Sequence, residues 1–530
     1  MKRDLILLIL VLIFSNIIYA QRWPKLSWYK TYNGPGDGVD IVQDVKFHNQ
    51  NFYLTGRSSG PDTSQDLLIL KYSDKGDSLL GIRYTANLHS WDEAASIAID
   101  SHENIYIVGS STFDQNTFYA MFQKYSPEGN LIFARNFNSD SNVYSEGVFV
   151  TLDSDEDPVM AYNRTSACVA KYSSSGDSIW TVTFSDDTSD YSVNYLLTDQ
   201  IGNIYACLIQ LYWDGGDLPT SNAVIVKLNK DGEVIWQTPV VRQVPGKILL
   251  DKEGNIILIT SSPGKTIKLD TDGNTQWTND ETNSQYPIEV QMGLVVDSDN
   301  NIIVAGYEFG NSSWDYRTKK ISPDGADIWS NDFESPEGLN DFAMDVALDG
   351  YDNVYVTGET HNSVSVGMCY TATYSKEGDP GWVFKFDPPN STFELGFRIF
   401  IGDSDFVYVG GETGEPGFGP DFLAFKIDYG YGNDVKLVNN NIPKNFLLSQ
   451  NYPNPFNPVT KIEFSIPRGD NVKIEIYDAL GRLVEELVNR YFSAGNYSVG
   501  FDASKLSSGI YFYRLTSGSF TQMKKAVLLK

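Results

Sequence analysis

The stretch Asn301-Ile302-Ile303-Val304-Ala305-Gly306 decides the fold, together with the segments that follow it, Tyr316–Ser322, Asp324-Gly325 and Asp327–Phe333. These apolar runs are short and turns separate them, which is typical of β-strands. The Asp-Gly pair suits a tight hairpin because glycine adopts positive φ at no steric cost. With Gly293–Asp297 in front of it, the stretch predicts a unit of four strands.

The same unit recurs along the chain and is marked by two anchors. The first is an apolar strand, usually entered through Asn, and its copies are Asn51–Gly56, Asn104–Gly109, Pro158–Met160, Asn203–Tyr205, Asn255–Ile257, Asn301–Gly306, Asn353–Gly358 and Phe406–Gly410. The second is a strand, usually containing Lys, that runs into a turn glycine, and these glycines are Gly76, Gly129, Gly176, Gly232, Gly273, Gly325 and Gly378. They lie 53, 47, 56, 41, 52 and 53 residues apart. A period of about 50 residues predicts the blades of a β-propeller.

A tryptophan recurs shortly after most of the turn glycines. The copies are Trp180, Trp236, Trp277, Trp329 and Trp382. An aromatic ring that returns at one strand position in successive repeats suits packing between blades. We therefore interpret these residues as structural rather than as ligand-stacking platforms.

The two ends of the repeat region predict how the ring closes. Leu26–Tyr32 reads as an outer strand without inner strands of its own, and the last unit, Leu395–Asp428, has three strands and lacks the outer one. If the first strand completes the last blade, no free sheet edge remains. The count is then eight blades, or seven if the degenerate third unit is misread. The repeats over residues 26–428 resemble the β-propeller repeats of secreted bacterial surface proteins.

The composition agrees with an all-β protein. Aromatic residues make up 13% of the 530 residues and glycine occurs 44 times, as expected for many short strands joined by tight turns. No stretch has sustained helical periodicity. We expect an all-β chain, with a propeller over residues 21–433 followed by a small β-sandwich.

The first twenty residues have the layout of a signal peptide. Lys2 and Arg3 are followed by the apolar run Leu5–Phe14, and the small residue Ala20 precedes Gln21. Ten apolar residues are too few to cross a bilayer core of about 30 Å, and no other segment is long and apolar enough. We expect residues 1–20 to be removed on passage to the periplasm, and no stable membrane span.

The charge is strongly acidic and unevenly distributed. The chain carries −28 in total, residues 434–530 carry +4 and residues 1–20 carry +1, so residues 21–433 carry −33. Such a surface repels the phosphates of nucleic acids and anionic lipids, and we expect neither as a partner. Neutral or cationic partners remain, including extracellular glycan or protein, although acidity also simply keeps a secreted protein soluble.

The sequence changes character after residue 433. Residues 434–443 read as a linker, in which Val438–Ile442 is mostly polar and Pro443 marks the end. In residues 444–530, short strands alternate apolar and polar side chains, as in Val472-Lys473-Ile474-Glu475-Ile476. About six such strands predict a small β-sandwich.

This C-terminal domain also carries an ordered set of short motifs. They are Tyr452-Pro453-Asn454-Pro455-Phe456-Asn457-Pro458, Ile476-Tyr477-Asp478 with Gly481, Gly509-Ile510-Tyr511 and the basic end. The combination resembles the type IX secretion sorting domain, type A, over roughly residues 444–530. The resemblance implies export by the type IX machinery, removal of the domain, and release or attachment at the outer-membrane surface. An ordinary C-terminal adhesion sandwich is the alternative. By this resemblance the sorting motif comprises Tyr452, Pro453, Asn454, Pro455, Phe456, Asp478, Gly481, Gly509 and Tyr511.

No motif in the sequence identifies a catalytic site or a cofactor. The four histidines and three cysteines lack metal-ligand spacing, and no histidine accompanies a nucleophile motif. The turns at Asp153–Asp157 and Asp297–Asn301 alternate oxygen-bearing side chains as calcium loops do, but turn chemistry explains them as well. We expect no cofactor and leave a structural calcium ion open.

Two functions fit these observations. The first is a surface-displayed or secreted binding or structural module, and the second is an extracellular glycan hydrolase or lyase with its site at the propeller mouth. The lack of a catalytic motif favours the first. Carboxylates clustered with an aromatic platform at one mouth of the ring would favour the second.

Overall fold

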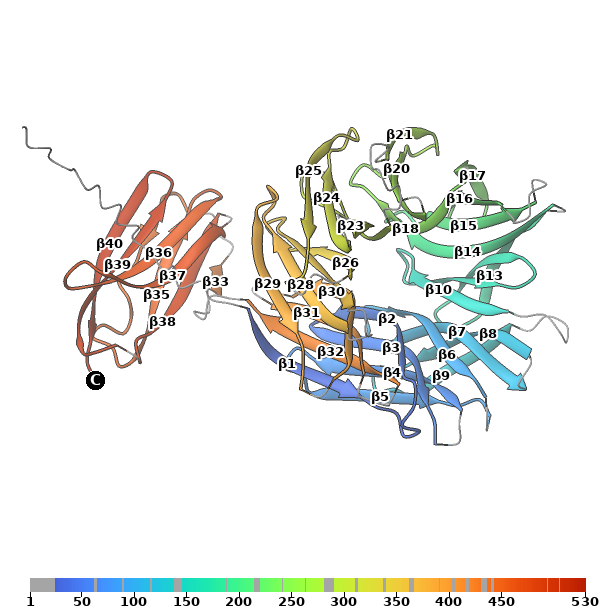
Figure 1. Ribbon diagram of the computed structural model, residues 1–530, viewed down its shortest axis with the longest axis horizontal. Coiled ribbons are helices and arrows are strands. Elements are labelled where there is room, and N and C mark those ends of the chain that lie inside the picture. The colour runs from blue at the N-terminus through green and yellow to red at the C-terminus, as the bar shows by residue number, and fades with distance from the viewer. Residues whose placement is uncertain are drawn as a thin grey trace, which may run out of the picture. The chain divides into compact units, whose positions relative to one another are not determined.

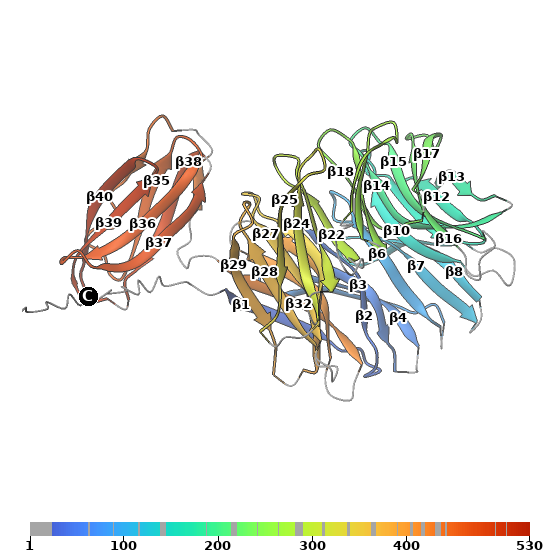
Figure 2. The same ribbon diagram turned by 45° about the horizontal axis from the view of Figure 1, so that its top comes forward.

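The computed structural model describes residues 24–530 except 62–63, 88–89, 115–116, 138–144, 187, 214–219, 241, 263, 281–289, 310–312, 337–339, 362–366, 390, 403–405, 415–418, 430–435, 440–442, 493 and 505. The expected signal peptide therefore lies outside the described residues. The regular elements of the described part are all β-strands (Figures 1 and 2). They belong to two compact units, Pro24–Asp428 and a C-terminal unit that begins at Tyr429.

The strands of the first unit form four-stranded antiparallel sheets, eight of them within the described residues. From inner to outer strand, the first four are β2 (Ile41–His48), β3 (Asn51–Ser59), β4 (Gln65–Ser73) and β5 (Ser78–Tyr84); β6 (Asp92–Ile99), β7 (Ile105–Asp114), β8 (Thr117–Tyr125) and β9 (Leu131–Phe137); β10 (Glu146–Leu152), β11 (Pro158–Asn163), β12 (Ala167–Tyr172) and β13 (Ser178–Phe184); and β14 (Ser189–Thr198), β15 (Ile204–Tyr212), β16 (Thr220–Leu228) and β17 (Val234–Val240).

The other four complete the ring. They are β18 (Val244–Leu250), β19 (Ile256–Ser262), β20 (Lys265–Leu269) and β21 (Thr275–Asp280); β22 (Val290–Val296), β23 (Ile302–Phe309), β24 (Trp314–Ile321) and β25 (Asp327–Phe333); β26 (Asn340–Leu348), β27 (Val354–His361), β28 (Gly367–Tyr374) and β29 (Pro380–Phe386); and β30 (Phe393–Ile401), β31 (Phe406–Gly414), β32 (Pro420–Asp428) and β1 (Lys25–Tyr32). Four-stranded sheets of this kind are typical of propeller blades. The degenerate third repeat forms a sheet of its own, β10 to β13.

The first strand closes the ring as the sequence predicts. β1 pairs antiparallel with β32, from Lys25 opposite Asp428 to Tyr32 opposite Phe422. The sheet that these strands share contacts β26 on one side and β2 on the other. Both neighbours of every sheet are therefore supplied by this chain.

Tryptophans of the outer strands bind five of the described sheets to the next one. Trp236 of β17 donates its indole N–H to the carbonyl oxygen of Thr271, in the turn of the following sheet, at 3.0 Å. Gly273 in that turn has φ +85° and lies against the indole face. Trp28, Trp180, Trp277 and Trp329 make the same contact with Asp74, Lys230, Pro323 and Lys376. The predicted packing between blades is confirmed for Trp180, Trp236, Trp277 and Trp329.

The two sequence anchors meet at an aspartate. In the sheet of β18 to β21, one carboxylate oxygen of Asp251 accepts the backbone N–H groups of Glu253 and Asn255, both at 2.9 Å. Its other oxygen accepts the Asn255 amide at 2.9 Å and lies 2.8 Å from Nζ of Lys268. Because a buried carboxylate must be paired, the Asn of the first anchor and the Lys of the second recur together.

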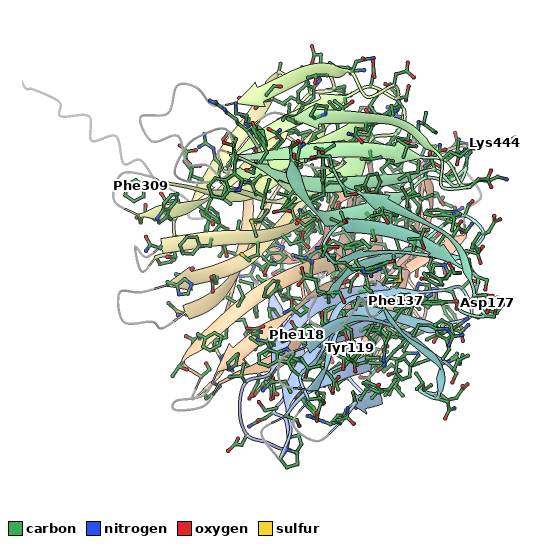
Figure 3. The ribbon with its side chains drawn as sticks, turned by 90° about the vertical axis from the view of Figure 1, so that its right-hand side faces the viewer. Phe118, Tyr119, Phe137, Asp177, Phe309 and Lys444 are labelled. Carbon is green, nitrogen blue, oxygen red and sulfur yellow. The ribbon has the colours of Figure 1, made fainter. Side chains whose placement is uncertain are left out.

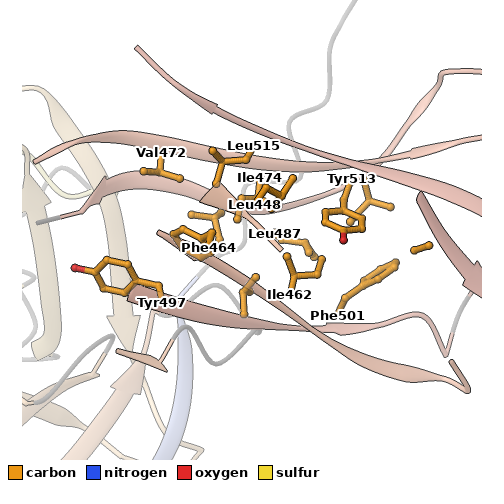
Figure 4. Close-up of a cluster of buried hydrophobic side chains, with 14 of the residues drawn as sticks. Leu448, Ile462, Phe464, Val472, Ile474, Leu487, Tyr497, Phe501, Tyr513 and Leu515 are labelled. Atoms are coloured by element: carbon orange, nitrogen blue, oxygen red, sulfur yellow. The ribbon is translucent and has the colours of Figure 1, made fainter. Parts of the chain in front are cut away.

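The C-terminal unit is a sandwich of two four-stranded sheets. One contains β33 (Lys436–Asn439), β38 (Gly495–Asp502), β35 (Val459–Ile466) and β34 (Leu447–Leu448), and the other β37 (Leu483–Phe492), β36 (Asp470–Asp478), β39 (Gly509–Ser517) and β40 (Phe520–Leu528). Their inner faces enclose one core that includes Ile462, Phe464, Ile474 and Leu515 (Figure 4).

The expected linker is wrong over part of its length. Lys436–Asn439 forms β33, and Lys436 lies opposite Ser498 of β38. A short segment of mixed polarity can still complete a sheet, because an edge strand satisfies its backbone through pairing. The sandwich thus includes strand-forming residues before 444, and it has more than the six strands expected.

The described residues contain no helix of the length and apolarity needed to cross a membrane.

Candidate functional site

A β-bulge recurs in the inner strand of every sheet. The register shifts fall between Val42/Asp44, Ala94/Ser96, Gly147/Phe149, Val193/Tyr195, Pro245/Ile248, Gln291/Gly293, Ala343/Asp345 and Gly396/Arg398. We call the end of the propeller where these inner strands begin the mouth. Bulges often redirect side chains next to binding sites, and here they do so at one level of the whole ring.

A pocket of 490 Å³ lies at the mouth, over the first three sheets of the chain. It is lined by Gln43, Trp91, Glu93, Ala95, Ser110, Phe118, Glu146, Gly147 and Val148, which come from β2, β6, β7, β8 and β10 and the residue before β6. Figure 3 labels Phe118 of β8, next to Tyr119. This volume is in the range of small-molecule sites.

Glu93 organises the polar side of the pocket. Its carboxylate pairs with the Arg57 guanidinium at 2.8 Å and accepts the Trp91 indole N–H at 3.1 Å. The other oxygen accepts the Gln43 side-chain amide. These contacts fix Trp91, whose ring stacks with Arg57 at 4.6 Å and is 39% exposed. The result is a rigid aromatic platform beside a carboxylate.

A second carboxylate lies behind Arg57. Glu412 of β31 is buried and accepts the backbone N–H of Val42 at 3.0 Å. Burial raises the pKa of Glu412 to about 7, which the positive charge of Arg57 partly offsets and the negative charge of Glu359 reinforces. Arg57 therefore acts on the carboxylates of two different sheets.

A second aromatic group lies at the mouth on β23, β26 and β27. Glu359 and His361 pair at 2.8 Å, and this contact raises the pKa of His361. The His361 ring contacts Phe342 edge-on at 5.6 Å, and Phe342 contacts Tyr307 edge-on at 4.7 Å. Glu359 is opposite Phe342 in the sheet register, as Ser110 is opposite Glu93.

Lysines pair with carboxylates of both calcium-like turns. Carboxylate oxygens of Asp297, Asp299 and Asp352 lie within 4.8 Å of one another. Asp297 and Asp299 belong to the predicted loop, and Asp352 comes from a neighbouring turn. Lys320 pairs with Asp297 at 2.8 Å and Lys376 with Asp299 at 3.0 Å. In the other turn, Lys171 lies 2.5 Å from Asp153. Part of the negative charge of each turn is thus balanced by an ammonium group.

Most residues of the predicted sorting motif hold the C-terminal sandwich together. Asn454 donates to the carbonyl oxygen of Lys525 at 3.1 Å and accepts the N–H of Val527 at 2.9 Å. Phe456 is buried in the core against Phe501. The peptide bonds before Pro453 and Pro455 are cis.

The later motif residues form a turn and the start of a strand. Asp478 accepts the N–H groups of Leu480 and Arg482, and Gly481 has φ +77°. Gly509 begins β39, and Tyr511 donates its hydroxyl to the carbonyl oxygen of Ser507 at 2.8 Å. Tyr452 differs from the rest of the motif because its side chain is 82% exposed.

The mouth residues escaped sequence reasoning. Arg57, Glu93 and Glu412 belong to no motif, and each stands on a different sheet. A weak signal is Trp91, which like Trp213 and Trp314 lies outside the position of the recurring tryptophans.

Comparison with known families identifies the C-terminal unit. Residues 450–529 match the family described as the secretion system C-terminal sorting domain. The chain carries a type IX sorting domain. This sorting domain directs the protein to the cell surface or outside the cell, and the signal-peptide layout of residues 1–20 is consistent with that route.

The propeller matches a repeat family over part of its length. Residues 168–373 are similar to the family described as outer membrane protein assembly factor BamB. No protein of curated function matches the chain.

Several solved structures have propeller architecture similar to this chain. The Dos1 propeller is 9% identical and covers 76% of this chain and 95% of its own, with a TM-score of 0.43. The polysaccharide lyase Uly1 is 10% identical, covering 76% and 100%, with a TM-score of 0.42. The WD40 domain of SCAP from fission yeast is 8% identical, covering 76% and 98%, with a TM-score of 0.41. At these identities the likeness concerns the fold alone.

Proposed function

We propose that the exported propeller is a binding module that holds an extracellular glycan or protein in the pocket at its mouth. The observation that carries this proposal is the Trp91 platform beside Glu93. An exposed ring fixed by a hydrogen bond and a stacked guanidinium offers apolar contact area at little entropic cost. The carboxylate, amide and hydroxyl groups around it supply directional hydrogen bonds, which is the usual division of labour in a ligand pocket.

The negative charge of the propeller limits which ligands can bind at its mouth. Residues 21–433 carry −33, so polyanions are repelled at the mouth. Neutral and cationic ligands are compatible with Glu93 and Glu146.

Binding is tested with the mature protein and its Trp91→Ala variant against glycan and peptide arrays. We expect the variant to lose at least about tenfold in affinity for any ligand of the wild type, which corresponds to about 1.4 kcal/mol. Ile235→Ala serves as the control, because Ile235 is an exposed apolar residue on the outer strand β17. Equal binding by wild type and Trp91→Ala would contradict the assignment of the pocket.

Glycan hydrolysis or elimination at the mouth is the second candidate. The carboxylates beside the Trp91 platform favour it, because this is the arrangement expected of an enzyme at the mouth. Glu412 also favours it, since a carboxyl group with a pKa of about 7 suits a general acid. Glu93 argues for binding instead, because both of its oxygens are held by neighbouring side chains. Turnover of polymeric glycans that is abolished in Glu412→Gln would favour the enzyme; bound but intact glycan favours the binding module.

A further inference from the structure

The pocket continues into an arc of carboxylates around the mouth, with aromatic groups at both ends. Glu93 pairs with Arg57, and the charge of Arg57 acts on Glu412. The charge of Glu359 acts on Glu412 from the other side. The arc thus passes from β6 over β3 and β31 to β27, which are four neighbouring sheets of the ring.

The far end of the arc is aromatic, as the near end is. Beyond Glu359 and His361 lie Phe342 and Tyr307, and Trp314 contacts Tyr307 edge-on at 5.6 Å. The side chain of His361 is 39% exposed, and Phe342, Tyr307 and Trp314 are only partly buried. Aromatic surface is therefore available at two separated places, with carboxylates between them.

The chemistry of this arc selects a class of ligand. A sugar ring has an apolar face of C–H groups, which packs on an aromatic face, and a rim of hydroxyls, which donate to carboxylates. A chain of such rings repeats both features along its length. A compact ligand would use only one end of the arc, whereas an extended one can use both.

The charge of the mouth further limits the class of ligand. Glu93, Glu146, Glu359 and Glu412 lie at the mouth, where Arg57 is already paired with Glu93 and His361 with Glu359. Uronate or sulfate groups would be repelled by these carboxylates, because Arg57 and His361 are already engaged by Glu93 and Glu359, whereas hydroxyls and amino groups would not be repelled.

We propose that the mouth binds a linear polysaccharide that is neutral or bears amino groups, with one subsite at Trp91 and a second at Phe342 and His361. The proposal rests on the proposed binding function and adds its ligand class and the second subsite. Two subsites on one rigid ring make the second contact intramolecular, so affinity increases with chain length until both are filled.

The test uses the full mature protein and three series of oligosaccharides of increasing length, measured by calorimetry. One series is neutral (β-linked glucose), one cationic (β-linked glucosamine) and one anionic (galacturonate). We expect affinity to rise with length in the neutral or the cationic series, and no binding in the anionic series. Affinity that does not depend on length in either series, or binding of the anionic series, would overturn the proposal.

Variants assign the two subsites. Phe342→Ala is expected to reduce affinity for the longest bound chain by about tenfold and to leave the shortest bound chain unchanged. Glu359→Gln, a milder change at the same subsite, guards against misfolding and is expected to have the same pattern with a smaller effect. Trp91→Ala is expected to weaken the binding of both the longest and the shortest bound chain.

The outcomes separate the two proposals. If Phe342→Ala and Glu359→Gln both bind long chains normally while Trp91→Ala does not, the second subsite is wrong and the pocket stands. If no oligosaccharide binds but a peptide binds in a Trp91-dependent manner, the proposed ligand class is wrong and the proposed binding function is supported. If ligands bind but Trp91→Ala changes nothing, both are wrong.

Discussion

Trp180 of β13 donates its indole N–H to the carbonyl oxygen of Lys230 in the next sheet, at 3.0 Å. The same ring covers Gly232, which has φ +86°, and a Cβ atom built on that glycine would lie 2.7 Å from Cδ2 of the indole. Glycine is required here twice, once for the backbone angle and once for the space. The contact recurs around the ring and explains why the turn glycine and the tryptophan recur together in the sequence.

This interlock predicts the effect of two substitutions. Gly232→Ala forces a Cβ into the indole and strains the backbone, so we expect a loss of about 1 to 3 kcal/mol in the free energy of unfolding. Trp180→Phe keeps an apolar ring and removes the donor, at a cost of about 1 kcal/mol. Denaturant unfolding measures both. Gly350→Ala, with no atom near the added Cβ, is the control, and a loss as large as that of Gly232→Ala would refute the explanation.

Ring closure depends on β1. Deleting residues 24–32 would uncover the hydrogen-bonding edge of β32 and remove the bond from Trp28 to the carbonyl oxygen of Asp74. An unpaired edge is a template for association. We expect a lower melting temperature and concentration-dependent oligomers in light scattering. A monomeric truncated protein that melts with the wild type would show that closure is dispensable.

The pKa of Glu412 makes stability depend on pH. Because burial raises this pKa from 4.5 to about 7, the folded protein binds more protons than the unfolded chain between these values, and stability falls as pH rises through that window. Glu412→Gln mimics the protonated side chain and can still accept from Val42. We expect it to raise the free energy of unfolding above pH 7, by on the order of 1 to 3 kcal/mol, and to have little effect below pH 4.5.

The matched control for this experiment is Glu377→Gln, at an exposed turn. A Glu412→Gln effect that is the same at both ends of the pH range would contradict the titration of this side chain.

Chelation tests the acidic cluster of Asp297, Asp299 and Asp352. Since Lys320 and Lys376 pair with its carboxylates, we expect EDTA to leave the melting temperature unchanged and added calcium not to raise it. Lys320→Met removes one buried counter-charge and is expected to destabilise the protein. A fall in melting temperature on chelation of the wild type would establish a structural ion.

Tyr452, the exposed residue of the sorting motif, is predicted to affect export without affecting stability. Tyr452 is mostly solvent-exposed, whereas Asn454 secures the end of the sandwich through Lys525 and Val527. We expect Tyr452→Ala to reduce delivery to the cell surface or medium without changing the melting of the purified protein. Asn454→Ala is expected to lower the melting temperature of the sandwich. Normal export of Tyr452→Ala would remove this side chain from the recognised surface.

Local rules explain what the sequence could predict. The Asp251 turn, the glycine at positive φ and the alternating strands are all decided within a few residues, and repetition multiplies the signal. The same applies to the Pro-rich entry and the Asp478 turn of the sorting domain, whose motifs identify it. The strand within the expected linker could not be predicted, because the pairing of Lys436 with Ser498 depends on a sheet edge that is far along the chain.

By itself, then, the sequence determined the repeat, its closure by the first strand, the acidic surface and the export route. The tertiary structure decided the mouth. Val42 and Glu412 are 370 residues apart and share a hydrogen bond, and Arg57, Glu93 and Trp91 meet across two sheets. No local spacing encodes such a meeting, because it results from a ring that brings the ends of different repeats to one opening.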